Sequence, residues 1–126
     1  MTDGLNMRKD ELTKRSRDFS VRVVKFCDFF CMRERSRVLA DQILRSGTSI
    51  GANIREAQNA SSKRDFIQKM SIALREANET QYWLEILHGA GKLSDAHFSS
   101  IYGDCTILAK MLSATVKTAK KNLNGQ

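Results

Sequence analysis

The chain has 126 residues, of which 41% are hydrophobic and 28% charged, and its formal net charge is +7. This composition supports one hydrophobic core, and the lack of a long apolar run or an apolar leader excludes a membrane span and a signal peptide, so we expect a cytoplasmic protein. Proline is absent and the three cysteines are an odd number, which predicts uninterrupted helices and free thiols.

The first predicted helix spans about residues 12–31 and follows a polar lead, residues 1–9, that we expect to be frayed. Its apolar residues recur at steps of three, four and seven, as in the seam of a helix bundle: Leu12, Phe19, Val23, Phe26 and Phe30. A basic connector follows, in which Ser36 is suited to cap the next helix.

The second predicted helix, about residues 37–59, has faces of two kinds. Ile43, Ile50 and Ile54 form a narrow apolar stripe. A stripe of short or forked polar side chains lies beside it and comprises Gln42, Arg45, Ser49, Asn53 and Glu56. Gly47 and Gly51 lie one turn apart, and they need a packing reason because a glycine inside a helix costs about 1 kcal/mol relative to alanine. Their partner is a helix of the same bundle or one from a neighbouring subunit, and we favour the neighbour.

Two further helices are predicted at about residues 63–88 and 95–121, with residues 122–126 frayed. Ser62 followed by Asp65 resembles a capping box, and Ser94 is suited to cap the last helix. Gly89-Ala90-Gly91 ends the third helix. No alternating apolar pattern predicts a strand. Four helices with short connectors predict a single all-α domain over residues 1–126, an antiparallel up-down-up-down, left-handed four-helix bundle.

An antiparallel hairpin of the second and third helices would place their polar residues opposite one another. Arg45 would pair with Glu76 or Glu79, and we expect this network to be partly buried, because the short side chains around it make a poor solubilising face. The alternative is an ordinary exposed ion pair. Tyr82 and Trp83 are adjacent and cannot both face one core, so we expect one of them at a subunit interface. Otherwise Tyr82 lies flat on the surface.

Catalytic and metal-binding patterns fit poorly. Glu85 and His88 form one Glu-x-x-His motif, whereas di-iron bundles need two such motifs and two further glutamates. Cys27 and Cys31 lie one turn apart with no histidine nearby in the sequence, which favours core thiols over a metal site. We therefore expect no enzyme activity, no metal and no cofactor.

The positive charge lies at the two ends of the chain. The first 37 residues hold ten Lys and Arg against six Asp and Glu, residues 38–90 hold six of each, and residues 91–126 hold five against two. The candidate nucleic-acid contacts are Arg15, Arg22, Lys25, Arg33, Arg35, Arg37, Lys110, Lys117, Lys120 and Lys121. Few aromatic residues lie between them, so RNA or DNA would be held by its phosphates with little sequence preference. The alternative is a solvated basic surface on a structural or adaptor oligomer whose partner is a protein.

Three segments together resemble one family. They are Gln42-Ile43-x-Arg45-Ser46-x-Thr48-Ser49-Ile50-Gly51-Ala52-Asn53-Ile54-x-Glu56-Ala57, Ser62-x-x-Asp65-Phe66, and Ile72-Ala73-Leu74-x-Glu76-Ala77-x-Glu79-Thr80-x-Tyr82-Trp83-Leu84. The chain resembles the bacterial ribosomal-RNA intervening-sequence proteins, small four-helix bundles historically grouped as a ribosomal protein family. The resemblance implies a ring-like homopentamer. A related protein, the accessory variability determinant of diversity-generating retroelements, is a basic pentamer that binds nucleic acid and a reverse transcriptase. Many members have Leu-Pro in the first connector, where this chain has Glu34-Arg35-Ser36-Arg37.

Overall fold

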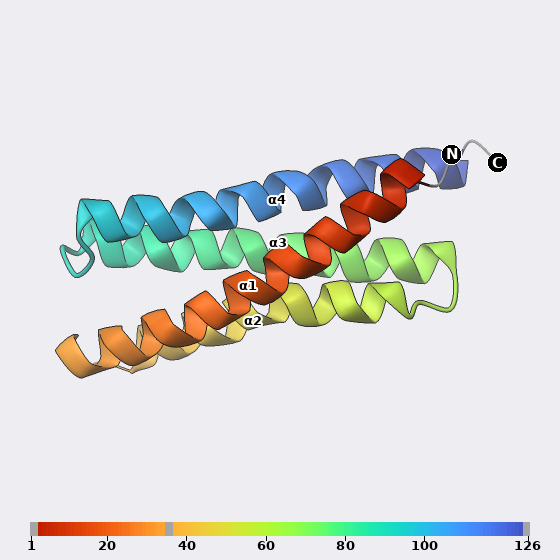
Figure 1. Cartoon of the computed structure of the whole chain (residues 1–126). Helices are drawn as coiled ribbons and strands as arrows, with labels where there is room; N and C mark the ends of the chain where they lie inside the picture. The colour runs from red at the N-terminus through yellow and green to blue at the C-terminus, as the bar shows by residue number, and fades with distance from the viewer. Residues whose placement is uncertain (1–2, 35–36, 125–126) are drawn as a thin grey trace.

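The protein is a four-helix bundle in which each helix runs antiparallel to the next (Figure 1). The computed structural model describes residues 3–34 and 37–124, and the side chains of residues 10–32 and 37–124. The helices are α1 (Asp3–Glu34), α2 (Val38–Gln58), α3 (Lys63–Gly89) and α4 (Asp95–Asn124). The start of α1 and the end of α4 lie at the same end of the bundle (Figure 1). The predicted all-α bundle is confirmed.

One apolar core runs through the four helices. It includes Leu12, Phe19, Val23 and Phe30 of the predicted seam in α1 and Ile43, Ile50 and Ile54 of the predicted stripe in α2. The other two helices contribute Met70, Leu84 and Leu87 of α3 and Ile101, Cys105, Leu108 and Leu112 of α4. Apolar side chains at steps of three and four share one face of a helix, so each helix buries one stripe and leaves the rest to solvent. None of the helices in the described ranges is long and apolar enough to cross a membrane.

The predicted helix boundaries are wrong at three ends, one of which is the end of α1, at Glu34 rather than residue 31. Helix α1 begins at Asp3 rather than near residue 12, so the expectation that residues 1–9 lie outside it fails for residues 3–9. Adding turns to a helix that has already nucleated is far easier than starting one, so α1 extends through a segment without apolar periodicity. Helix α4 likewise continues past residue 121 to Asn124.

The starts of α2 and α3 differ in their capping. The proposed cap Ser36 lies outside the described residues, and Arg37 holds the N-cap position of α2 without a side-chain hydrogen bond. At the start of α3, Ser62 Oγ accepts from the backbone N–H of Asp65 at 3.0 Å. The Asp65 carboxylate in turn accepts from the backbone N–H of Ser61 at 3.1 Å, one residue earlier than in the usual capping box. The predicted cap at Ser62 is therefore confirmed.

The connector between α3 and α4 is a tight turn that requires glycine. Gly91 has a φ of +76°, in the left-handed region that glycine adopts without strain. Its N–H donates to the carbonyl of His88, and the next N–H, of Lys92, donates to the carbonyl of Leu87. These two bonds form a Schellman motif, which satisfies the last carbonyls of α3. Ser94 Oγ then accepts from the backbone N–H of His97 and caps α4, as predicted.

Helix α1 packs unequally on its two neighbours. It contacts α2 extensively and α4 over fewer residues, and it crosses the bundle obliquely (Figure 1). The side of α1 that faces α2 is therefore packed more tightly than the side that faces α4.

Candidate functional site

The polar residues of α2 and α3 meet in the register that the sequence predicts. Arg45 lies 3.3 Å from the carboxylate of Glu76 and also pairs with Glu79. Glu79 accepts a further hydrogen bond, at 3.2 Å, from the indole N–H of Trp83. Further along the hairpin, Lys69 lies 3.4 Å from Glu56. The predicted pairing of Arg45 with Glu76 or Glu79 is thus present with both carboxylates.

The burial of this network is less than expected. The Arg45 side chain is 49% exposed, while that of Glu76 is 20% exposed. Within one chain the guanidinium therefore lies at the surface, where solvent screens an ion pair to below about 1 kcal/mol. The short polar residues beside it do not extend the network across the hairpin, because Ser49 Oγ donates to the carbonyl of Arg45 and Asn53 Nδ2 donates to that of Ser49.

A buried hydroxyl pair, which the sequence pattern did not predict, joins α2 to α3. Ser46 and Thr80 are both 0% exposed. The Thr80 hydroxyl lies 2.9 Å from that of Ser46, and Ser46 Oγ donates to the carbonyl of Gln42 at 2.9 Å. The signal that could have identified this pair is Thr80 in the apolar seam of α3, which places its hydroxyl in the core next to α2.

Gly47 and Gly51 face α1 of the same bundle, so the preference for a neighbouring subunit is wrong. A Cβ atom on Gly47 would lie 2.9 Å from a methyl group of Val23. A Cβ atom on Gly51 would lie 3.3 Å from both the carbonyl oxygen of Ser16 and the hydroxyl of Ser20. The two glycines allow the backbones of α1 and α2 to approach closely, which is the reason that the helix tolerates them.

As predicted, Tyr82 and Trp83 do not both face the core. Trp83 is partly buried and packs against the core, while Tyr82 is 54% exposed on α3. Their rings meet edge to face with centroids 5.3 Å apart. Two more apolar residues are exposed near this end of the α2–α3 hairpin: Val38, 74% exposed, and Ile86, 38% exposed. This surface, comprising Val38, Tyr82, Trp83 and Ile86, is hereafter the hairpin patch.

The basic residues of α4 form an acid-free stripe. Lys110, Lys117, Lys120 and Lys121 are exposed, and the last acidic residue of the helix is Asp104. Among the described residues, none of these four lysines pairs with a carboxylate. Their ammonium groups therefore project a positive field that no neighbouring acid cancels.

The basic residues of α1 differ from those of α4, because three of them, Lys14, Arg15 and Arg22, already have acidic partners. Arg22 lies 2.6 Å from Asp104 of α4 and donates to the hydroxyl of Ser100 at 2.7 Å. Arg15 pairs with Glu11, one turn away, at 3.1 Å. Lys25 and Arg37 are exposed. Arg35 and the side chain of Arg33 lie outside the part of the chain that the structure describes.

The candidate catalytic and metal-binding residues have other contacts. The Nε2 atom of His88 lies 2.6 Å from Asp95, and the hydroxyl of Tyr102 donates to Glu85, which raises the pKa of Tyr102. Burial raises the pKa of the Cys27 and Cys105 thiols to about 12, so both stay protonated and unreactive. Within the described residues, no three His, Cys, Asp or Glu side chains gather as metal ligands would.

The fold and these surfaces define a class: a basic four-helix bundle with a closely packed α1–α2 interface and a polar α2–α3 hairpin. The profile of the 23S rRNA-intervening sequence protein family matches residues 8–114, and the chain belongs to this family. The chain is also similar to a crystal structure from Bacteroides thetaiotaomicron, a protein of unknown function from the S23 ribosomal protein family. The identity is 44%, the TM-score is 0.85, and the match covers 87% of this chain and 98% of the other. No curated protein matches the chain.

Proposed function

We propose that the chain forms a homo-oligomer in the cytoplasm, a pentameric ring, that binds RNA or DNA through its basic surface and catalyses no reaction. The observation that carries the proposal is the acid-free stripe of α4, which holds four exposed lysines without an acidic partner among the described residues. Binding of phosphates by such a stripe releases counterions and needs no base-specific contact. The name of the family, which refers to 23S ribosomal RNA, is consistent with an RNA ligand.

Assembly would strengthen weak contacts of this kind. In a ring, each stripe is repeated in every subunit, so a long polyanion can contact several stripes at once and the contacts act together. The hairpin patch supports association, because its exposed aromatic and aliphatic side chains are the residue types that gather in interfaces between subunits. The half-exposed Arg45 beside it would then become buried against a neighbour.

The test is an anisotropy titration with a labelled structured RNA at two salt concentrations. We expect binding at low salt that weakens steeply as salt rises. The double variant Lys117→Gln/Lys121→Gln should bind more weakly and should reduce the slope of log K against log salt by about 0.7–0.9 for each lysine that contacts a phosphate. Lys14→Gln is the matched control, because Lys14 already pairs with Asp18. Absence of binding at low salt would refute the proposal.

The second candidate function is a structural or adaptor oligomer that binds a protein. The hairpin patch favours it, because an exposed apolar surface can receive a partner as well as another subunit. The ratio of absorbance at 260 and 280 nm, measured on the protein as purified, together with native mass spectrometry, separates the two candidates. Co-purifying nucleic acid supports the first candidate. An oligomer that contains protein alone and does not bind RNA at low salt supports the second.

A further inference from the structure

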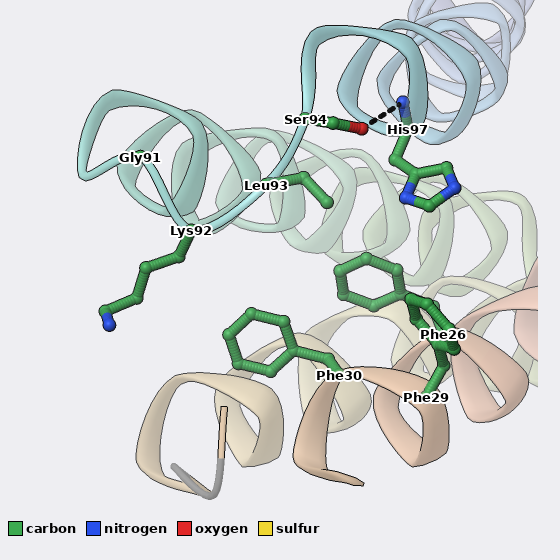
Figure 2. A pocket seen from close by; sticks show the side chains of 8 residues that line it. All are labelled: Phe26, Phe29, Phe30, Gly91, Lys92, Leu93, Ser94 and His97. Atoms are coloured by element: carbon green, nitrogen blue, oxygen red, sulfur yellow. Dashed lines mark hydrogen bonds between the residues drawn. The ribbon is translucent and has the colours of Figure 1, made fainter. Parts of the chain in front are cut away.

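A cavity opens between α1 and the connector that joins α3 to α4 (Figure 2). Its volume is about 340 Å³, at the small end of the range of ligand sites in proteins. It lies on the side of α1 that faces α4, where the two helices make few contacts. A space of this size admits one or two rings of a ligand but no folded domain.

Three phenylalanine rings and the imidazole of His97 line part of its wall. Phe26 and Phe30 stack with centroids 5.9 Å apart and an interplanar angle of 19°. Phe29 is 49% exposed and meets the imidazole of His97 edge to face, with centroids 5.8 Å apart. Leu93 and His97 lie across from the three phenylalanines (Figure 2). Phe29 is therefore the ring that a ligand would reach first.

The polar part of the described lining is cationic or neutral. Among the residues that the structure describes, the lining includes Lys92, Ser94 and His97 and no Asp or Glu. The side chain of Lys92 extends from the connector at the edge of the cavity (Figure 2). One exposed aromatic ring, that of Phe29, in a cavity with a cationic side chain at its edge suits a flat ring attached to an anionic backbone.

We propose that this cavity receives an unpaired nucleobase of a bound RNA, which stacks on Phe29 while Lys92 contacts the adjoining phosphate. Unpaired bases of loops and bulges can swing out of the stack and lie against aromatic rings, whereas bases in a duplex cannot. The inference rests on the proposed function and deepens it. The lysine stripe would bind any RNA by its phosphates, and this second site would add affinity for those RNAs that carry unpaired bases.

The cavity and the stripe lie along the same helix. His97 and Lys117 both belong to α4, and the rise of an α-helix separates them by about 30 Å. The residues between them also turn Lys117 about 200° around the helix axis from His97, so a hairpin RNA whose stem lies along the lysine stripe reaches the cavity where its loop passes around α4 near the connector. A fully paired duplex of the same length would contact the stripe alone.

The experiment compares a hairpin RNA that carries 2-aminopurine in its loop with a paired duplex of equal length, both at low salt. We expect the hairpin to bind at least about fivefold tighter than the duplex, with quenching of the loop fluorophore as it stacks. Phe29→Ala should remove the quenching and the whole of this preference while leaving the duplex affinity unchanged. Phe29→Leu repeats the test with more apolar volume retained, in case the alanine variant folds poorly. The control Val21→Ala removes a similarly exposed apolar side chain, 43% exposed, from α1 outside the cavity.

The possible failures are distinguishable. Equal binding of hairpin and duplex, or a hairpin preference that survives loss of the Phe29 ring, would overturn the inference and leave the proposed function standing. In that case the cavity would be free to take an apolar side chain of a protein partner. If neither RNA binds at low salt, the proposed function is wrong, and the inference of a base-binding site is wrong as well.

Discussion

The two sides of α1 are built from different kinds of residue. On the side of α2, Gly47 and Gly51 bring the backbones together, and Ser16, Ser20 and Val23 fill the remaining space. On the side of α4, the helices are joined by the long side chain of Arg22, which reaches Asp104, and farther along a cavity opens between them. Small residues make a close contact that tolerates no added volume, whereas long polar side chains span a wider gap. The closed side thus holds the fold together, and the open side has room for a ligand.

The largest effect should come from adding volume on the closed side. In Gly47→Leu, the first added carbon would already lie 2.9 Å from a methyl group of Val23, a residue that is fully buried and stiff at χ1. We expect a loss of about 3 kcal/mol or more of stability, enough to unfold a marginally stable chain. A urea denaturation curve followed by circular dichroism measures it.

Gly103→Ala is the matched control for this substitution. Gly103 lies inside α4, and a Cβ atom there would meet no atom within 4 Å. Because alanine is the better helix former, the control should gain up to about 1 kcal/mol. Normal stability of Gly47→Leu would show that the α1–α2 interface is looser than the structure indicates.

The second-largest loss of stability should come from the two buried thiols as pH rises. The pKa of Cys27 and of Cys105 rises from 9.0 to about 12 in the fold, chiefly through burial. In the unfolded chain both thiols ionise near pH 9, so the folded state, which keeps its protons, loses stability between about pH 9 and 12. The slope should reach up to about 1.4 kcal/mol per pH unit for each thiol.

Urea midpoints at pH 8 and pH 10.5 measure this loss. The double variant Cys27→Ala/Cys105→Ala should be less stable at pH 8, because it loses packing, and should decline less steeply with pH. That difference in slope isolates the thiols from the lysines, which also titrate in this range. Parallel slopes for the two proteins would mean that the thiols ionise in the fold as they do in water.

The closed side also shows what the sequence could and could not predict. Helical periodicity predicts which residues are buried, because it depends on local spacing alone. The pairing of Arg45 with Glu76 is predictable because a short turn between α2 and α3 sets the register of the hairpin. The direction of Gly47 was not predictable in this way. Which neighbour fills the space beside a glycine depends on how α1 crosses α2, and a glycine carries no side chain whose polarity would indicate a direction. The cavity beside Phe29 was not predictable for a related reason. It arises from the oblique path of α1, and the spacing of apolar residues does not indicate that path.

A smaller effect is expected at the buried hydroxyls of α2 and α3. Thr80→Val keeps the shape of the side chain and removes the hydroxyl that contacts Ser46. We expect a loss of about 1 kcal/mol, because Ser46 then lacks one buried partner. Adding Ser46→Ala should cause little further loss, since no polar group then remains unpaired at that point. A double-mutant cycle in urea tests the coupling, and strictly additive losses would indicate that the two hydroxyls act independently.

The smallest effect should appear on the open side of α1. Arg22→Gln removes the ion pair with Asp104, in which the two side chains are 38% and 50% exposed. Pairs with this exposure contribute less than about 1 kcal/mol and weaken in salt, so the variant should lose little stability at low salt and almost none at 0.5 M NaCl. Asp104→Asn should lose as little stability as Arg22→Gln. The double variant should lose no more stability than either single variant. A loss of several kcal/mol that persists in high salt would mean that α4 holds α1 as firmly as α2 does, and the contrast between the two sides of α1 would then disappear.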